Sequence, residues 1–329
     1  MKQSALEYLA CPECGGEFVL LTVACEAAEV MSGALECRAC RQRWPIRRGV
    51  PRFAGDVAGV EARTAAAFAY EWTKYDELAN RYRQQFLDWI RPLEPADFRD
   101  RVVLEGGCGK GRHTAIVAEY GARAVLAVDL SDAVDAAFAN TRTCANVHVI
   151  QGDLIRPPLR QVADVAFSIG VLHHLPDPEA GFRALVSRLR PSGLIAAWVY
   201  GREGNGWIVH VVTPLREHLT SHLPHPVLDS LAGALTVPLF AATRLLYGPT
   251  RGTPLARALP YAPYLSYIAP FPFREQRSIV FDHLVAPVAH YLRREEVAGW
   301  FERAGLTNVR IEAHNANSWR GCGRVPAGH

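Results

Sequence analysis

The feature that most constrains this chain is a glycine-rich turn between a predicted strand and a predicted helix, at residues 102–114. Three apolar residues predict a short buried strand, which ends at Glu105. Glycines follow at alternate positions, and a helical pattern begins at about Arg112. Because glycine lets backbone N–H groups approach a ligand closely at a helix N-terminus, this turn predicts a ligand-binding site in an α/β fold.

The spacing of the glycines distinguishes two kinds of binding turn. A dinucleotide-binding turn has the pattern G-x-G-x-x-G, but Arg112 stands where its last glycine would fall. The pattern here, E-x-G-x-G-x-G, resembles motif I of the class I S-adenosylmethionine (SAM) methyltransferases. The resemblance implies a Rossmann-like seven-stranded methyltransferase sheet with SAM as its cofactor. The motif I residues that it implies as cofactor contacts are Glu105, Gly107, Cys108, Gly109 and Gly111.

Downstream of this turn, strand and helix patterns alternate, which predicts a parallel sheet with helices on both faces. Ligands of such sheets bind beyond the carboxyl ends of the strands. Asp129 follows the predicted strand 124–128, and Asp153 follows the predicted strand 147–150. A single aspartate after a strand is usually a turn or capping residue, but carboxylates after three successive strands are hard to explain in that way. The other predicted strands are 101–105, 164–169, 194–200, 308–312 and 319–325, the last of them antiparallel.

The resemblance also implies a role for each of these positions. Asp129 would accept hydrogen bonds from both ribose hydroxyls of the cofactor, and Asp153 would accept one from the adenine amino group. Leu130 and Ile169 would enclose the adenine ring, and Leu154 belongs to the same cofactor-binding set.

The segment 167–178, Phe-Ser-Ile-Gly-Val-Leu-His-His-Leu-Pro-Asp-Pro, is similar to the segment after strand 4 in methyltransferases of the ubiquinone-biosynthesis type. It differs from the Asn-Pro-Pro-Tyr type that gathers a planar amino group, which disfavours methylation of adenine N6 or of a glutamine amide. His173 and His174 are candidate general bases, because imidazole titrates near neutral pH. Alternatively, they only shape the cofactor site. Asp282 is the third candidate catalytic residue.

Residues 1–55 predict a separate zinc ribbon. Two C-x-x-C pairs each place two thiolates on one metal ion, and together they complete a tetrahedral site. The alternative is four unligated thiols. A unit this short buries little apolar surface, so the metal would supply much of its folding energy. The segments 9–16, 35–40 and 44–51 resemble the small zinc-ribbon proteins that activate tRNA methyltransferases, which implies a docking module for a protein partner. The predicted zinc ligands are Cys11, Cys14, Cys37 and Cys40.

Two further regions complete the predicted domain organisation. Residues 56–100 predict a linker and N-terminal helices, and residues 101–329 predict the methyltransferase domain. An aromatic cluster in the first of these regions either lies across the cofactor mouth, as a similar Tyr-Glu-Trp segment does in many small-molecule methyltransferases, or simply packs against the main domain. The members of this cluster are Phe68, Tyr70, Trp72 and Tyr75.

A long insertion, 202–290, follows the predicted fifth strand and predicts an α-helical lid over the acceptor pocket. The run 230–243 has no charged residue, but Pro238 interrupts it, and it is too short for a confident membrane span. It predicts either the core of the lid or a helix in a membrane interface. The aromatic residues expected to line the pocket are Tyr261, Tyr264, Tyr267, Phe271 and Phe273.

The net charge of +3 and the absence of a basic tract argue against nucleic acid as a partner. We therefore expect a SAM-dependent methyltransferase for a small-molecule acceptor, which would be a natural product, a sugar or a lipid-linked metabolite. One alternative is an RNA methyltransferase that recognises its substrate through the ribbon. Another is a non-catalytic SAM-binding protein that docks a partner through the ribbon. The N-terminus carries no long apolar segment, so we expect a cytoplasmic location, with membrane association if the insertion contacts lipid.

Overall fold

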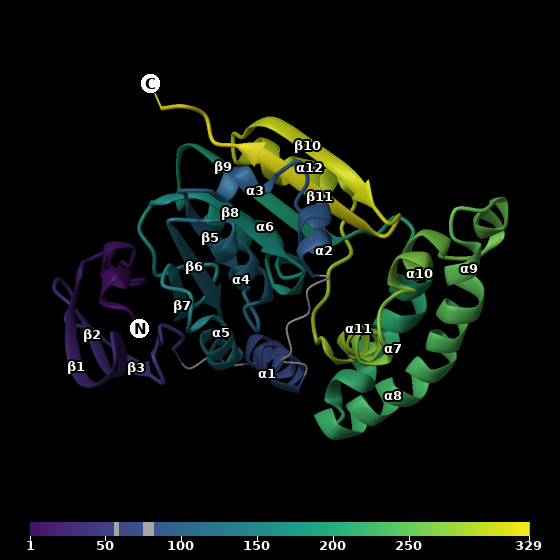
Figure 1. Cartoon of the computed structure of the whole chain (residues 1–329), viewed down its shortest axis with the longest axis horizontal. Coiled ribbons are helices and arrows are strands. Elements are labelled where there is room, and N and C mark those ends of the chain that lie inside the picture. Colours follow the sequence, from purple (N-terminus) through teal and green to yellow (C-terminus); the bar gives the residue numbers. More distant parts are fainter. Residues whose placement is uncertain (56–58, 75–81, 329) are drawn as a thin grey trace.

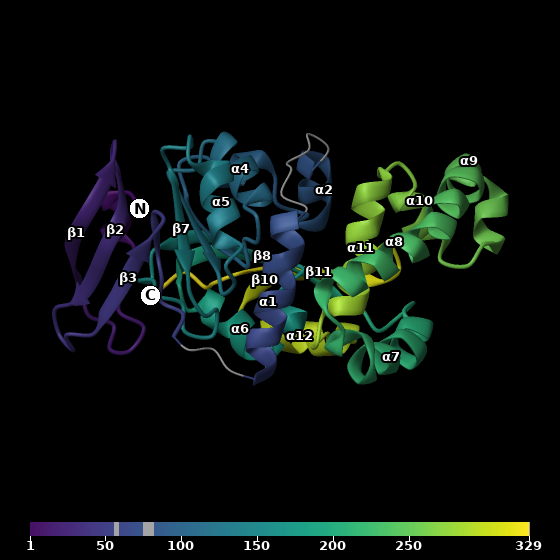
Figure 2. The same cartoon turned by 90° about the horizontal axis from the view of Figure 1, so that it is seen from below.

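The computed structural model describes residues 1–55, 59–74 and 82–328, so Tyr75 lies outside the described residues. Three parts lie in a row (Figures 1 and 2). A small β-sheet is at one end, a larger sheet with its helices is in the middle, and a group of helices from the insertion is at the other end. Helix α1 (Gly59–Lys74) lies between the larger sheet and the insertion in both views.

The central sheet has seven strands in the order β10-β11-β9-β8-β5-β6-β7. Neighbouring strands from β9 to β7 are parallel, and β11 is antiparallel to both of its neighbours. This topology confirms the predicted Rossmann-like seven-stranded sheet and its antiparallel last strand. The strands are β5 (Val102–Gly106), β6 (Ala124–Asp129), β7 (Val147–Gln151), β8 (Ala163–Ile169), β9 (Leu189–Tyr200), β10 (Thr307–His314) and β11 (Ser318–Arg324).

Alternation along β5 divides the core into two layers, because successive side chains of a strand point to opposite faces. Val102 and Leu104 pack with α6 and α12, whereas Val103 packs on the other face with α2, α4 and α5. The sheet is thus covered on both faces, as the alternating pattern predicts. The helices around it are α2 (Tyr82–Trp89), α3 (Pro95–Phe98), α4 (Arg112–Glu119), α5 (Val134–Thr141), α6 (Pro178–Val186) and α12 (Arg294–Arg303).

The N-terminal ribbon is an antiparallel sheet in the order β1-β2-β3-β4 that docks at the β7 edge of the central sheet. Arg52 pairs with Gln151 there through a parallel β-bridge. Leu35 and Ile46 of the ribbon belong to the same buried cluster as Leu126 of β6. The ribbon therefore shares a core with the main domain. Its elements are η1 (Gln3–Glu7), β1 (Phe18–Glu26), β2 (Glu29–Cys37), β3 (Arg43–Arg47) and β4 (Val50–Pro51).

The insertion is helical, as predicted. Helix α8 packs on α11 through Leu228 and Ala232, which contact Phe281 and Leu284, and Ala67 of α1 joins this small core. Its elements are η3 (Ile208–Val212), α7 (Thr213–His218), η4 (Thr220–His222), α8 (His225–Ala242), η5 (Thr243–Tyr247), α9 (Gly248–Thr250), η6 (Pro254–Ala258), α10 (Ala262–Ile268) and α11 (Phe273–Val285).

One continuous helical stretch in the described part of the chain, His225–Thr250, has the length and composition of a membrane-crossing helix, with a mean hydropathy of 1.4. Only 28% of its most apolar window is buried. Leu235, Val237 and Leu245 are exposed on it. The two interpretations of this run, lid core and membrane interface, both remain predictions.

Arg52 and Arg48 give a matched test of ribbon docking, because both guanidinium groups pair with Asp135. The Arg52 side chain is 10% exposed and the Arg48 side chain is 80% exposed. Arg52→Ala should lower the free energy of unfolding by about 1–3 kcal/mol, because it removes the hydrogen bonds of a largely buried guanidinium to Asp135 and Gln151. Arg48→Ala should cost less than about 1 kcal/mol. Urea denaturation followed by tryptophan fluorescence measures both, and equal effects would contradict the docking role of Arg52.

Candidate functional site

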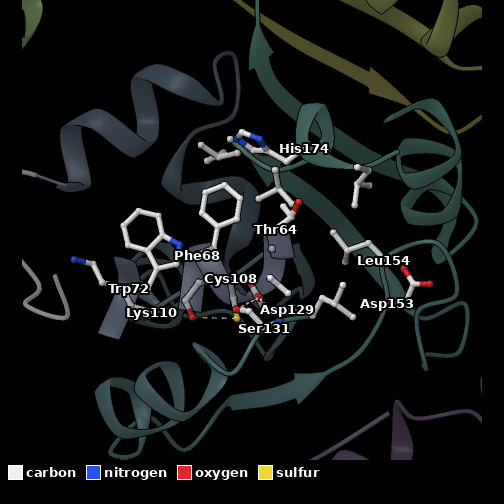
Figure 3. A pocket seen from close by; sticks show the side chains of 18 of the residues that line it. Thr64, Phe68, Trp72, Cys108, Lys110, Asp129, Ser131, Asp153, Leu154 and His174 are labelled. Carbon is white, nitrogen blue, oxygen red and sulfur yellow. Dashed lines mark hydrogen bonds between the residues drawn. The ribbon is translucent and has the colours of Figure 1, made fainter. Parts of the chain in front are cut away.

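A first cavity of about 130 Å³ lies at the carboxyl ends of the parallel strands (Figure 3). Eight of the ten residues predicted to bind the cofactor line it. The residues that the structure brings together here are Gly107, Cys108, Gly109, Asp129, Leu130, Asp153, Leu154 and Ile169.

Close contacts explain why glycine occupies positions 107 and 109 of the turn. Gly107 has φ +82°, and a Cβ atom there would lie 2.2 Å from a methyl carbon of Val171. Gly109 has φ +51°, and a Cβ atom there would lie 3.1 Å from Nε1 of Trp72. A larger residue at either position would be strained and would push a wall of the cavity aside. The turn therefore presents bare backbone to the first cavity.

Asp129 is fixed by donors on both of its carboxylate oxygens. The Gly109 N–H donates to Oδ2 over 2.8 Å, and the Ser131 N–H and hydroxyl donate to Oδ1 over 2.9 and 2.7 Å. Burial raises the pKa of this carboxyl, and the hydrogen bonds oppose that effect. Oδ2, which among the described residues accepts only from Gly109, keeps a further lone pair, so the pre-oriented carboxylate can still accept from a ligand hydroxyl.

Glu105 and Gly111 lie outside the described wall of the first cavity. The Glu105 carboxylate is buried beneath the turn, where it accepts a hydrogen bond from the Thr114 hydroxyl and lies 3.7 Å from Nδ1 of His113. Burial raises the pKa of Glu105 to about 8. Gly111 is the N-cap of α4, with φ +80°. In the structure, neither residue lines the first cavity: Glu105 is hydrogen-bonded to α4, and Gly111 joins the turn to that helix.

Two aromatic residues of α1 form a wall over the turn. Phe68 and Trp72 both line the first cavity, and Trp72 lies against Gly109. The charged groups of Lys110 and Arg112 lie 5.6 and 5.7 Å from the centroid of the Trp72 ring. Figure 3 shows both rings beside the cavity. Phe68 and Trp72 thus lie across the mouth of the cavity, one of the two arrangements predicted for this aromatic segment.

The two adjacent histidines lie in different places. His174 lines the first cavity, and its ring meets the Phe68 ring edge-on at 4.8 Å between centroids. Its Nδ1–H donates to the Val288 carbonyl over 2.6 Å, which leaves Nε2 as the proton-accepting nitrogen. Burial lowers the pKa of both rings, well below the ordinary value for His173. The His173 ring is completely buried outside the walls of both cavities described here.

A second cavity of about 400 Å³ adjoins the first. Asp282 of α11 lines it and accepts a hydrogen bond of 2.6 Å from the Tyr200 hydroxyl at the end of β9. Burial raises the pKa of Tyr200 well above 10, so its hydroxyl stays the donor in this pair. The wall is otherwise rich in aromatic rings, which include Tyr82, Trp89, Trp198, Tyr264, Tyr267, Phe271 and Tyr291.

The insertion supplies one side of this second cavity through α10, α11 and the residues between them, together with Asn205 near its start. Of the aromatic residues predicted to line an acceptor pocket, Tyr264, Tyr267 and Phe271 do so. Tyr261 instead packs on Trp207, and Phe273 packs on Phe240 of α8. Neither ring lines the second cavity, because Tyr261 precedes α10 with a left-handed backbone, φ +55°, and Phe273 begins α11 against α8.

The cysteine cluster lies in the ribbon, apart from both cavities. The Sγ atoms of Cys11, Cys14, Cys37 and Cys40 are all within 4.8 Å of one another. Two of the separations, Cys11–Cys40 and Cys14–Cys37, are 3.7 and 3.5 Å. A tetrahedral zinc site with Zn–S bonds of about 2.3 Å separates its sulfurs by about 3.8 Å, so the four thiols fit zinc.

Comparison with known proteins identifies two parts of the chain. Residues 104–197 match the family model described as a methyltransferase domain. This part of the chain is a methyltransferase domain. Residues 2–49 match the model of Trm112p-like proteins, so the ribbon is a Trm112p-like domain, as the predicted resemblance to methyltransferase activators implies.

Curated relatives match part of the chain. A tRNA U34 carboxymethyltransferase of Ruthia magnifica subsp. Calyptogena magnifica is 33% identical over 108 residues, which are 32% of this chain and 32% of that protein. Another, of Pseudoalteromonas translucida, is 29% identical over 160 residues, 48% of this chain and 45% of that protein. A ubiquinone biosynthesis O-methyltransferase of Idiomarina loihiensis is 26% identical over 133 residues, 37% and 51% of the two chains. The chain thus spans between a third and a half of these relatives.

A solved structure gives the fold over a longer range. The DhpI–SAH complex superposes with a TM-score of 0.50 at 16% identity, covering 82% of this chain and 98% of that one. The central part of this protein therefore has the fold of SAM-dependent methyltransferases.

The methyltransferase domain fits SAM as its cofactor. Gly107 and Gly109 line the first cavity with backbone atoms, and the Asp129 carboxylate is held at the adjoining strand end. Leu130, Leu154 and Ile169 supply apolar surface for an adenine ring. When bound, SAM supplies an electrophilic methyl group on its sulfonium.

We expect Asp129→Ala to weaken SAH binding by about 1.5–3 kcal/mol, because it removes a charged acceptor for the ribose hydroxyls. Asp132→Ala is a matched control, since the Asp132 side chain is 80% exposed and lies outside the first cavity. Isothermal titration calorimetry measures both affinities. An unchanged affinity in Asp129→Ala would disprove the assignment.

We expect one zinc ion per chain, and Cys37→Ser should lose it because three thiolates hold zinc less tightly than four. Cys25→Ser is the control, since Cys25 is an exposed thiol outside the cluster. Metal analysis of protein prepared without chelator measures the zinc content. Protein without zinc, or a Cys37→Ser variant with full zinc, would contradict this prediction.

Proposed function

We propose that this protein is a SAM-dependent methyltransferase whose acceptor enters the second cavity. The observation that carries the proposal is the wall common to both cavities. Six residues line both, so a cofactor in the first cavity and an acceptor in the second would face each other directly. These residues are Phe68, Trp72, Lys110, Arg112, Ile169 and Gly170.

The task of the chain in such a reaction is to orient the acceptor and to exclude water. Tyr264 and Tyr267 of α10 and Phe271 after it cover the second cavity from the insertion side, and Trp72 covers it from α1. Rigid aromatic faces hold a planar acceptor in one orientation, and alignment of nucleophile with methyl carbon is a large part of the rate enhancement.

For the acceptor itself, we propose a nucleoside of tRNA. The sequence favours a small molecule and argues against nucleic acid, but the curated relatives support the RNA alternative better, since several are named tRNA U34 carboxymethyltransferases. A nucleobase turned out of its stack needs aromatic faces and nearby cations, and the second cavity offers Trp72 and Tyr264 with Lys110, Arg112 and Arg274. The Trm112p-like domain would then contact the RNA or a protein partner.

A free small molecule is the second candidate. The relative named ubiquinone biosynthesis O-methyltransferase favours it, as does the aromatic wall that the insertion adds to the cavity. Such an acceptor would fill the cavity without contacting the ribbon, which lies at the opposite end of the molecule (Figure 2).

Incubation with methyl-labelled SAM distinguishes the two candidates. One reaction contains bulk tRNA, and the other contains a cell extract freed of protein and RNA. We expect label in tRNA, its disappearance with Asp129→Ala, and loss of labelling at high salt, because phosphate contacts are salt-sensitive. Mass spectrometry of the nucleosides then tells a methyl from a carboxymethyl group. Label only in the extract would favour the small molecule, and none in either would overturn the proposal.

We expect Tyr264→Leu to lower kcat/KM for the labelled acceptor by an amount equivalent to about 1–3 kcal/mol, because it removes a stacking face. SAH affinity should be unchanged. Tyr261→Leu is the matched control, since Tyr261 packs on Trp207 outside the second cavity. Equal effects of the two substitutions on kcat/KM would contradict the acceptor-site assignment.

A further inference from the structure

A buried carboxylate in the second cavity has one oxygen that nothing in the described part of the chain satisfies. Glu71 lies on α1, lines the second cavity and is 1% exposed. The Ser278 hydroxyl of α11 donates to its Oε1 over 2.6 Å. Its Oε2 is buried and has no hydrogen-bond partner among the described residues.

Such an atom is costly to keep. A buried carboxylate oxygen without a donor loses its hydration and gains nothing in exchange, a penalty of about 1–3 kcal/mol or more for a charged group. Native structures seldom tolerate this outside functional sites, where a ligand supplies the missing donor. Because Glu71 lines the cavity, a bound acceptor would be that donor.

The surroundings of Glu71 prepare it to exchange a proton near neutral pH. Burial, followed by the negative charge of Asp282, raises the pKa of Glu71 to about 8, while the Ser278 hydrogen bond and the charges of Arg112 and Lys110 oppose that rise. A base works best when its pKa is close to the working pH. The other titratable or charged groups lining the cavity are Tyr82, Tyr200, Tyr264, Tyr267, Arg274, Glu275, His283 and Tyr291.

We propose that Glu71 is the general base of the methyl transfer, and that its Oε2 accepts the hydrogen bond and then the proton of an N–H or O–H nucleophile in the second cavity. This inference rests on the proposed function. It specifies the acceptor as a heteroatom that still carries a proton at neutral pH. In the balanced reaction, the lone pair of the nucleophile forms the bond to the methyl carbon, and the sulfur–methyl bond breaks with its electron pair left on sulfur. The proton passes to Glu71 and afterwards to solvent.

Other groups at the site are less suited to this task. Asp282 already accepts the Tyr200 hydroxyl, and His174 lines the first cavity, not the second. His283 does line the second cavity, and its Nδ1 has no hydrogen-bond partner within residues 1–55, 59–74 and 82–328, but burial lowers its pKa and makes it the weaker base. The role left for Asp282 is to raise the pKa of Glu71 through its negative charge. The Ser278 hydroxyl holds Oε1 of the Glu71 carboxylate by its hydrogen bond.

The test is a pH profile of methyl transfer to the acceptor pool that the wild-type protein labels. The wild-type rate should rise with pH to a plateau above about 8, because the base acts only when deprotonated. Glu71→Gln keeps the size of the side chain and an oxygen for Ser278, yet cannot take a proton. It should lower the rate by about 100-fold or more and remove the rise with pH, with SAH affinity within twofold of wild type.

Two positioning variants keep Glu71 and should move the midpoint of the pH profile of methyl transfer in opposite directions. Ser278→Ala removes a hydrogen bond to the charged form, so the midpoint of the pH profile should shift upward. Asp282→Asn removes a neighbouring negative charge, so the midpoint should shift downward. A purely structural role for these residues would not produce opposite shifts. These variants decide the question if Glu71→Gln fails to bind SAH.

The outcomes separate cleanly. A wild-type protein that labels neither pool overturns the proposed function, and this inference falls with it. An active wild type with an equally active Glu71→Gln variant, or with midpoints that do not move in the two positioning variants, overturns only the role of Glu71. Loss of the pH-dependent limb in His283→Gln, with Glu71→Gln unaffected, would assign the base to His283 instead.

Discussion

The close approach of side chains to the backbone of the glycine-rich turn is the constraint on which the rest of the site depends. Val171 occupies the space that a Cβ atom would take at Gly107, and Trp72 occupies it at Gly109. The first contact joins β5 to the loop after β8, and the second joins the turn to α1. Without bare backbone at these two positions, α1 would have to move away from the sheet, and both cavities would lose a wall.

The ribbon with the four-cysteine cluster shares part of the buried core of the protein. Leu35 and Ile46 lie in one buried cluster with β6, and Arg52 closes the junction through Asp135. Apolar burial against the central domain therefore adds to whatever stability zinc provides. The ribbon and the insertion occupy opposite ends of the central sheet, so a partner held by the ribbon would meet the second cavity only if it spanned the molecule.

Sequence periodicity and local motifs were sufficient for the sheet, the four-cysteine cluster and most of the wall of the first cavity, because each depends on short motifs within the chain. They were insufficient where the direction of a side chain decides whether the residue lines a cavity. Glu105 and His173 belong to the right segments, yet the fold buries both away from the cavities. The second cavity was the least predictable part. Glu71 meets Ser278 only because α1 and α11, more than 200 residues apart in the chain, pack together, and no spacing in the sequence predicts that contact.

The wall shared by the two cavities has a thermodynamic consequence. Phe68 and Trp72 face both, so a ligand that fixes their rings in one cavity changes the free energy of binding in the other. Such linkage is reciprocal: whatever factor a cofactor applies to the affinity of the acceptor, the acceptor applies to the affinity of the cofactor. With cofactor and acceptor placed as proposed, two aromatic side chains of α1 would link cofactor retention to acceptor occupancy.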